Sequence, residues 1–120
     1  MRHFLAIAAV VLLPFAAHAE GDAAAGKTVF SQCAICHSAK QGENKIGPSL
    51  YGVVGRPSHS EPGFTYSDAM KGYDVTWTEA ELDKYLVDPR KVVVGTKMIF
   101  PGIKDDTKRA NLIAYLATLK

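Results

Sequence analysis

The chain has 120 residues and a mass of 13.0 kDa, with 48% hydrophobic residues, 22% charged residues and a formal net charge of +2. This composition is ordinary for one compact domain and excludes a disordered or collagen-like chain. The small net charge and a pI of about 8.5 also argue against a nucleic-acid-binding protein, which usually carries a dense basic surface.

The first nineteen residues predict a secretory signal peptide. Arg2 supplies a positive start, residues 4–17 are apolar, and Ala17-His18-Ala19 is a small-x-small cleavage site. An uncleaved membrane anchor is the alternative, but this apolar run is interrupted by Pro14 and is shorter than the ~20 residues of a membrane-spanning helix. We expect residues 1–19 to be removed and residues 20–120 to form the mature domain, whose net charge falls to +1 because Arg2 is lost.

The first helix predicted in the mature domain runs from about Asp22 to the two cysteines. Asp22 is a candidate N-cap, because its carboxylate can accept hydrogen bonds from the first amides of a helix. Ala25, Val29 and Cys33 then recur at helical spacing. This pattern predicts a helix that leads directly into Cys33 and Cys36.

Two further helices are predicted in the second half of the chain. One opens with a capping box at Thr78 to Glu81 and should end before Pro89, because a proline disfavours helical backbone in the residue before it. The other begins near Asp105 and Asp106, whose negative charges suit a helix amino terminus. The apolar faces of these two helices are formed by Leu82, Tyr85 and Leu86, and by Leu112, Ile113, Leu116 and Leu119.

The connections between these helices are long and rich in glycine and proline. Only the three valines at 92–94 hint at extended structure, and they are too few for a sheet. We therefore expect a small all-α fold of about three main helices with long loops. Such a domain has little helix-on-helix surface, so a large apolar group at its centre would make it more stable.

The run Cys33-Ala34-Ile35-Cys36-His37 has the C-x-x-C-H pattern of covalent attachment to a c-type haem. Residues three apart share one face of a helical turn, so both thiols can bond to the two vinyl groups on one haem edge. His37 follows at once and is close enough to offer its imidazole to the iron. The motif predicts one haem c, bound through Cys33 and Cys36, with His37 as a ligand of the iron.

Other uses of the two cysteines are less consistent with the pattern. A disulfide between them would close almost no loop and constrain the unfolded chain little. A redox-active dithiol normally follows a strand, and none is predicted before Cys33. A zinc site with Cys33, Cys36 and His37 needs a fourth ligand, for which His59 is the remaining histidine of the mature chain. Neither alternative gives the adjacent His37 a clear role.

The sixth ligand of the iron decides the function, because a protein ligand makes an electron carrier and an open position invites oxygen or peroxide chemistry. The candidates in the mature chain are His59, Met70 and Met98. An isolated methionine is usually a core side chain. Met98 has the most suitable context, since Gly95 and Gly102 flank it and allow the backbone to approach a large ring closely.

From Gly21 to Lys120 the chain resembles the class I cytochromes c, both the mitochondrial type and its bacterial periplasmic relatives. Besides the haem-attachment run, the matching stretches are GPSLYG at 47–52, PGFTYSDA at 62–69, TW at 76–77, YL at 85–86, GTKMIF at 95–100 and NLIAYL at 111–116. The resemblance implies Met98 as the sixth ligand. It also implies three main helices wrapped around the haem, the first crossing the last.

The resemblance further implies roles for residues around the haem. Pro48 would accept a hydrogen bond from His37, which orients the imidazole and raises its basicity. The residues that match propionate-binding positions are Arg56, Tyr66 and Trp77, and those beside the methionine ligand and a propionate are Tyr85 and Thr96.

Two positions depart from the mitochondrial pattern. Met70 replaces an asparagine of a buried polar network, and Val94 replaces a proline in the loop before the methionine ligand. We expect Met70 to make the haem pocket drier and Val94 to loosen the loop of the ligand.

Iron held by both His37 and Met98 has no open position for substrate, which predicts an electron-transfer protein and not an enzyme. Weak peroxidase activity after detachment of Met98 is the alternative. The resemblance implies a soluble, single-haem carrier that moves one electron at a time in the periplasm. Its donor would be a quinol–cytochrome c reductase or similar complex, and its acceptor a terminal oxidase or reaction centre.

The same resemblance implies transient docking of membrane electron-transfer complexes on a basic rim around the haem edge. The matching positions are Lys45, Arg90, Lys91, Lys97 and Lys104. We expect no nucleic-acid partner and a monomeric protein. A haem protein dedicated to one periplasmic dehydrogenase or reductase is the alternative to a general shuttle.

Overall fold

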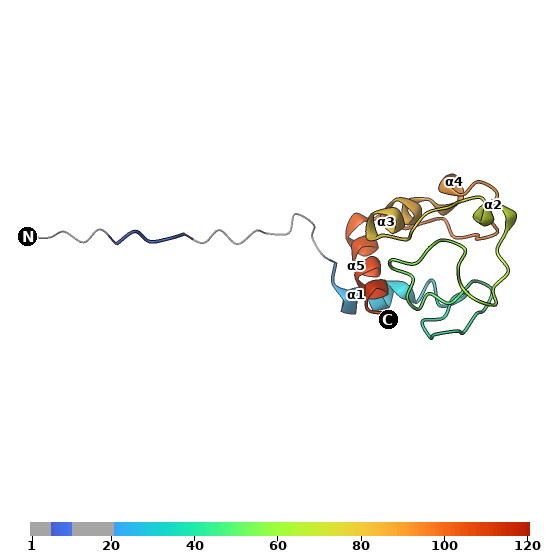
Figure 1. The fold of residues 1–120 in the computed structure, drawn as a ribbon, viewed down its shortest axis with the longest axis horizontal. Coiled ribbons are helices and arrows are strands. Elements are labelled where there is room, and N and C mark those ends of the chain that lie inside the picture. Colours follow the sequence, from blue (N-terminus) through green and yellow to red (C-terminus); the bar gives the residue numbers. More distant parts are fainter. Residues whose placement is uncertain (1–5, 11–20) are drawn as a thin grey trace, which may run out of the picture.

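The computed structural model describes residues 6–10 and 21–120 of the chain. Most of the predicted signal peptide lies outside these residues, so its presence and cleavage stay predictions. Residues 21–120 contain the helices α1 (Ala23–Phe30), α2 (Asp68–Lys71), α3 (Glu79–Val87), α4 (Pro89–Val92) and α5 (Asp106–Ala117), joined by long loops (Figure 1). Among the described residues, no helix is both long enough and apolar enough to cross a membrane.

The all-α prediction is confirmed, and α1, α3 and α5 are the three main helices. The short helices α2 and α4 were not expected. Pro89 begins α4, where its missing N–H costs no hydrogen bond. Val92 is the last residue of α4, so it is not extended as the three valines had hinted. The described residues contain no strand, only an isolated antiparallel bridge between Pro57 and Thr76.

Helix α1 begins as predicted but ends earlier. The Asp22 carboxylate accepts hydrogen bonds from the amides of Ala24 and Ala25 at 2.9 and 3.3 Å. After Phe30 the chain continues in hydrogen-bonded turns, in which the amides of Cys33 and Ala34 both bond to the carbonyl of Phe30, at 2.8 and 3.0 Å. The helix-to-cysteine prediction was therefore too long at its carboxyl end, because helical spacing does not distinguish a last helical turn from a series of such turns.

Helix α3 ends at Val87, before Pro89 as predicted, but only half of its capping box forms. Thr78 Oγ1 accepts the hydrogen bond from the Glu81 amide at 3.1 Å. The Thr78 amide instead donates to the carbonyl of Thr76, and the Glu81 carboxylate accepts a bond from the hydroxyl of Tyr73 at 3.4 Å. The Glu81 carboxylate thus bonds to Tyr73, which lies outside the helix, in place of the Thr78 amide that would complete the capping box.

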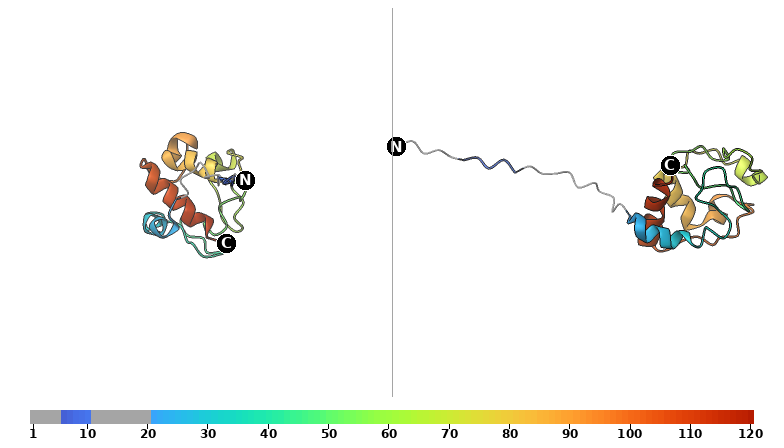
Figure 2. Two further views of the ribbon diagram at one scale, coloured as in Figure 1. Left: turned by 90° about the vertical axis from the view of Figure 1, so that its left-hand side faces the viewer. Right: turned by 90° about the horizontal axis from the view of Figure 1, so that it is seen from below.

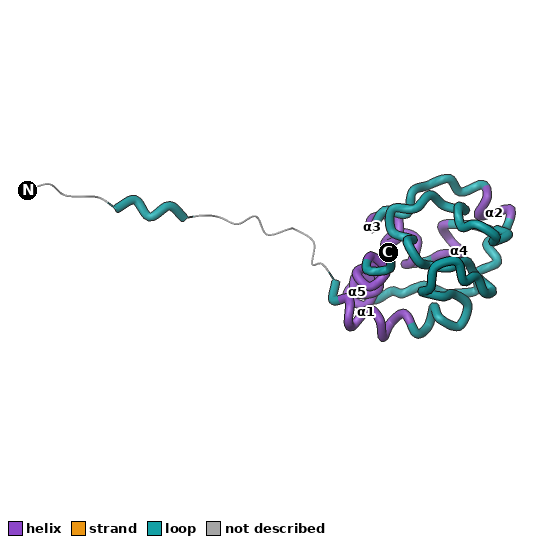
Figure 3. Tube along the Cα trace, turned by 60° about the horizontal axis from the view of Figure 1, so that its bottom comes forward, coloured by secondary structure: helices purple, strands orange, loops and turns teal. Residues whose placement is uncertain are grey.

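Helices α1 and α5 cross in close contact, as the resemblance implied (Figures 2 and 3). Gly26 allows the approach, because a Cβ atom at this position would lie 1.8 Å from the carbonyl oxygen of Asn111. The rings of Phe30 and Tyr115 pack beside it with their centroids 5.1 Å apart. Asn111 Oδ1 also accepts a hydrogen bond from the Asp22 amide at 2.8 Å, which joins the start of α1 to α5.

Arg109 connects α5 to α3. Its side chain is only 8% exposed, and it forms ion pairs at 2.7 Å with Asp83 on α3 and with Asp106 on its own helix. Its third bond goes to the carbonyl of Ile103 at 3.0 Å. Partners for a buried guanidinium matter because an unpaired buried charge would destabilise the fold strongly.

The buried hydrophobic core is small for a domain of this length. Around it lies a larger set of hydrophobic side chains that are only partly buried, among them Leu50, Met70, Met98 and Phe100. The buried members are Phe30, Val53, Trp77, Leu82, Tyr85, Leu86, Val93, Ile103, Leu112, Ile113 and Leu116. A large apolar group in contact with the partly buried set would add to a core that is modest by itself.

The contact at Gly26 makes a prediction about stability. Alanine is favoured over glycine inside a helix by about 1 kcal/mol, but the overlap with the Asn111 carbonyl forces backbone to move. We expect Gly26→Ala to lower the free energy of unfolding by about 1–3 kcal/mol in urea titrations followed by circular dichroism. Gly72→Ala is the control, because its Cβ would meet nothing closer than 3.7 Å. Equal stabilities of the two variants would contradict this account of the helix crossing.

Candidate functional site

The C-x-x-C-H segment occupies the turns after α1, where both cysteines are partly buried and carry free thiols. Burial, with a smaller contribution from the nearby Cys36, raises the pKa of the Cys33 thiol to about 11. A redox-active dithiol needs a lowered pKa, so Cys33 does not have the environment of one. Within the described residues, no three of the His, Cys, Asp and Glu side chains are grouped to hold a metal ion, which removes support for the zinc alternative.

His37 is held in one orientation by the loop that follows the motif. Its Nδ1 lies 2.7 Å from the carbonyl oxygen of Pro48, and since a carbonyl only accepts, Nδ1 carries the proton. This leaves Nε2 with a free lone pair. Burial lowers the pKa of His37, the bond to Pro48 opposes this, and the charges of Arg56 and Lys45 lower it further. The imidazole is thus neutral at neutral pH, the form that binds iron.

Gly47 lies directly against the imidazole of His37. A Cβ atom there would be 2.3 Å from Cε1 of the ring, and the amide of Gly47 also bonds to the carbonyl of Cys36 at 2.8 Å. The sequence contains this glycine in a matching stretch, but its steric role depends on the fold. The space beside the ring exists because residue 47 has no side chain.

Met98 is partly buried, and its sulfur is the acceptor of a hydrogen bond from the hydroxyl of Tyr85 at 3.5 Å. Burial raises the pKa of Tyr85 to about 12, with a further contribution from Tyr73, so the donor keeps its proton at neutral pH. The amide of Met98 bonds to Thr96 Oγ1 at 3.1 Å, and Gly95 supplies the positive φ of +88° in this loop. Tyr85 and Thr96 therefore lie beside Met98, as the resemblance implied.

The other two candidates for the sixth ligand have different surroundings. His59 Nε2 pairs with the carboxylate of Asp74 at 2.5 Å. Met70 lies in α2 and packs against the hydrophobic core. The hydrogen bonds of the Tyr85 hydroxyl and of Thr96 Oγ1 go to Met98 and to neither of these two residues.

Arg56 is the best-buried cation of the loops. Its Nη1 donates to the carbonyls of Ser49 and Tyr51 at 3.0 and 3.1 Å and to the carboxylate of Glu61 at 2.9 Å. Its Nε is buried and has no hydrogen-bond partner among the described residues. An unpaired buried donor is costly, so Nε fits a further anionic or carbonyl oxygen such as a haem propionate.

The partner of Arg56 was missed in the sequence. Glu61 belongs to none of the motifs found in the sequence, although its side chain is only 10% exposed in the pair. Tyr66 supports the same loop, because its hydroxyl accepts the hydrogen bond from the Glu61 amide at 3.0 Å. Glu61 stands between two of the stretches that match the family, and a single polar residue there does not indicate its partner.

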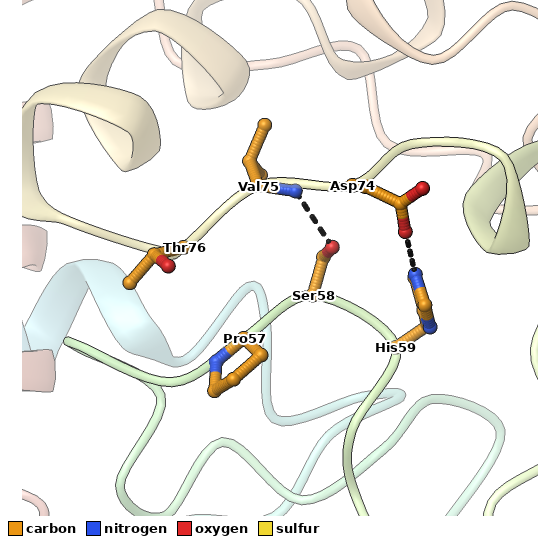
Figure 4. Close-up of a pocket in the computed structure, with 6 residues that line it drawn as sticks. All are labelled: Pro57, Ser58, His59, Asp74, Val75 and Thr76. Carbon is orange, nitrogen blue, oxygen red and sulfur yellow. Dashed lines mark hydrogen bonds and ion pairs between the residues drawn. The ribbon is translucent and has the colours of Figure 1, made fainter.

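A shallow pocket marks the place where two loop segments are joined (Figure 4). Ser58 is buried, donates to the carbonyl of Tyr73 at 2.6 Å and accepts from the amide of Val75 at 3.0 Å. His59, at a φ of +43°, reaches across to Asp74 beside it. These contacts fix the segment after Arg56 against the segment before Trp77, two residues expected to hold the haem.

Residues 23–120 match the family model described as Cytochrome c. The chain belongs to the cytochrome c family. It is 49% identical to a cytochrome c2 of Rhodomicrobium vannielii, covering 93% of this chain and 90% of the relative. It is 52% identical to a cytochrome c2 of Rhodopila globiformis over 83% of this chain and 95% of that one. The solved structure of cytochrome cH from Methylobacterium extorquens superposes with a TM-score of 0.77 at 47% identity, over 82% of this chain and 99% of that one.

Membership of the cytochrome c family confirms the resemblance and the fold class. The cofactor is therefore covalently bound haem c, and the protein carries electrons and is not an enzyme. The unpaired Nε of Arg56, the close approach of Gly47 to the imidazole and the free Nε2 of His37 all fit this group.

Gly47 supplies a direct test of the site. Gly47→Ala places a methyl group on the His37 ring, so we expect the ring to move away from the Pro48 carbonyl. The free energy of unfolding of the haem protein should fall by about 1–3 kcal/mol, together with a change in its visible spectrum. Gly72→Ala, whose Cβ would make only ordinary contacts at 3.7 Å, should change neither quantity. An unchanged spectrum in Gly47→Ala would show that the ring does not depend on this contact.

Proposed function

We propose that this chain is a soluble periplasmic electron shuttle, in which Cys33 and Cys36 attach the haem and His37 and Met98 ligate its iron. Its donor would be a quinol–cytochrome c reductase or a similar complex, and its acceptor a terminal oxidase or a reaction centre. The names of the cytochrome c2 relatives support a bacterial carrier, and the predicted signal peptide supports export.

The observation that carries the proposal is the geometry of His37. Nδ1 is bonded to Pro48 and Nε2 is left free, directly after two thiols on the same turns. The bond to the carbonyl fixes the direction of the ring and raises its basicity as a ligand. His37 is therefore prepared to bind a metal on one side of a haem attached at Cys33 and Cys36.

Met98 would supply the ligand on the other side. The haem, when bound, contributes an iron that gains and loses one electron. The soft thioether of Met98 favours the reduced iron and raises the reduction potential. The hydroxyl of Tyr85 holds the sulfur through its hydrogen bond, so the same two ligands can remain in both oxidation states. With both ligands bound, the iron would have no open position for a substrate.

Arg56 would bind a propionate through Nε. Its Nη1 is already committed to two carbonyls and Glu61, so the guanidinium is oriented before the haem group meets it. Trp77 directly follows the segment that the Ser58 and His59 contacts hold, and Tyr66 bonds to the amide of Glu61, the partner of Arg56. The expected propionate bonds of Tyr66 and Trp77 belong to the same proposal.

Of the five cations expected around the haem edge, Arg90, Lys91 and Lys97 are the best candidates for docking a partner, because Lys45 and Lys104 already bond within the protein. Lys45 Nζ donates to the carbonyl of Ala34 at 2.7 Å, and Lys104 Nζ bonds to the carbonyl of Val87 and lies 3.8 Å from Asp88. Arg90, Lys91 and Lys97 are exposed and have no ion pair within the described part of the chain. Transient electron-transfer complexes use such charges to speed encounter.

Replacement of Met98 tests the ligand assignment. Met98→Ala should keep covalent haem, lose the weak far-red band of methionine sulfur on oxidised haem, and lower the reduction potential by on the order of 0.1 V, because the soft ligand is removed. Met70→Ala is the matched control and should keep both the band and the potential. A band that survives in Met98→Ala and disappears in Met70→Ala would reverse the assignment.

The docking proposal predicts a dependence on salt. The electron-transfer rate constant with an acidic partner should fall as ionic strength rises, and replacing Arg90, Lys91 and Lys97 by glutamine should lower the low-salt rate about tenfold. The control replaces the exposed Lys27, Lys108 and Lys120, which lie at α1, α5 and the carboxyl end. A wild-type rate that does not change with salt would contradict the basic docking surface.

A further inference from the structure

Three aromatic side chains form a continuous path from Met98 toward the surface. Tyr85 contacts the Met98 sulfur through its hydroxyl at 3.5 Å. The ring centroids of Tyr85 and Trp77 are 4.9 Å apart, and those of Trp77 and Tyr73 are 6.0 Å apart. These separations are those of aromatic rings in contact, which is close enough for an electron to move between neighbouring rings.

The two tyrosines at the ends of this path have different surroundings. The Tyr85 ring is buried, and the acceptor of its hydroxyl is a thioether sulfur, which does not take up a proton. Tyr73 is only partly buried, and its hydroxyl donates to the carboxylate of Glu81 at 3.4 Å. A carboxylate can accept a proton, so only the outer tyrosine has a proton acceptor beside it.

A tyrosine ring can hold the oxidising equivalent only if a neighbouring group accepts the proton of its hydroxyl. A phenol that loses an electron becomes a strong acid, and its oxidation is favourable only where the O–H proton has a base to receive it. Trp77 is buried between the two tyrosines and is a suitable intermediate carrier, since an indole can lose an electron and keep its proton for a time.

Tyr73 is also held in place by its main chain. Its carbonyl accepts the 2.6 Å bond from the buried hydroxyl of Ser58, and its amide donates to the carbonyl of Met70 at 3.0 Å. Glu81 belongs to α3 and donates its own amide to the cap residue Thr78. The main chain of Tyr73 is thus held by the buried Ser58, and the main chain of Glu81 by the helix cap Thr78.

We propose that Tyr73, Trp77 and Tyr85 form an exit path that carries strong oxidising equivalents away from Met98 to Tyr73. The oxidant is a hydroperoxide that reaches the haem when Met98 detaches, and it leaves as an alcohol and water after taking up two electrons and two protons. One of these electrons comes from Trp77 by way of Tyr85, which leaves Trp77 one electron short, and the other comes from the haem group. An electron then passes from Tyr73 to the oxidised Trp77, the Tyr73 O–H bond breaks, and the proton goes to Glu81. The products are neutral Trp77, a Tyr73 phenoxyl radical and protonated Glu81. An external reductant such as ascorbate returns one electron to Tyr73 and one to the haem group, and Glu81 gives the proton back to Tyr73.

This protective function goes beyond electron shuttling, but it rests on the proposed haem site. The test treats the purified haem protein with hydrogen peroxide, freezes it rapidly and records the tyrosyl radical by electron paramagnetic resonance. We expect the wild-type signal to disappear in Tyr73→Phe. In Glu81→Gln, which keeps the size of the side chain and removes the base, the signal should fall at least about tenfold.

The damage left in the protein is a second measurement. Without Tyr73 the hole stays near the haem, so oxidation of Met98, Trp77 and Tyr85, mapped by peptide mass spectrometry, should increase several-fold in Tyr73→Phe. Tyr115→Phe is the matched control, because Tyr115 packs against Phe30 and is not part of the path. It should keep both the radical yield and the wild-type pattern of damage.

Failure of the path and failure of the carrier proposal give different results. The far-red band and reversible reduction of the wild type and of Tyr73→Phe report on the carrier proposal and do not depend on Tyr73. A Tyr73→Phe protein that keeps both properties and still gives the wild-type radical yield and damage pattern overturns the exit path alone. An unchanged radical yield in Glu81→Gln overturns the role of Glu81 as the proton acceptor.

Discussion

The close crossing of α1 and α5 is the contact on which the rest of the domain depends. Gly26 lets the two backbones meet, and Phe30 and Tyr115 pack beside the crossing. Helix α1 leads directly to the two cysteines, while α5 connects to α3 through the buried Arg109. The position of the haem-attachment segment relative to α3, which carries Tyr85, is therefore set by contacts between the two ends of the domain.

The core explains why a chain of this size accepts so much loop. Few hydrophobic side chains are fully buried, and many others, including Met98 and Phe100, are only partly covered. A covalently attached haem would bury part of that surface and cannot dissociate, so its contribution to stability does not depend on its concentration. Polar contacts then hold the loops themselves, since Arg56 and Ser58 satisfy backbone carbonyls that have no helix or sheet to pair with.

The proposed iron ligand Met98 and the proposed exit path for oxidising equivalents lie close together. Tyr85 supports the sulfur of Met98 and, through Trp77, also contacts Tyr73 at the outer end of the aromatic path. Ordinary one-electron shuttling needs the iron ligands to stay in place. A strong oxidant would threaten Met98, the proposed sixth ligand, because thioether sulfur is readily oxidised. An outer tyrosine with Glu81 as its base gives the oxidising equivalent a less damaging place to react.

The sequence by itself determined the features that neighbouring residues encode: the helix caps at Asp22 and Thr78, the start of α5 near Asp105, the end of α3 before Pro89, and the C-x-x-C-H run. The length of α1 and the second half of the Thr78 capping box were wrong, because a turn and a tertiary hydrogen bond competed with the local pattern. Only the tertiary structure decided that Arg56 meets Glu61, that Gly47 lies against His37, and that Tyr73 meets Glu81. These pairs come from irregular loops, whose paths are set by packing against distant segments and leave no periodic signal in the sequence.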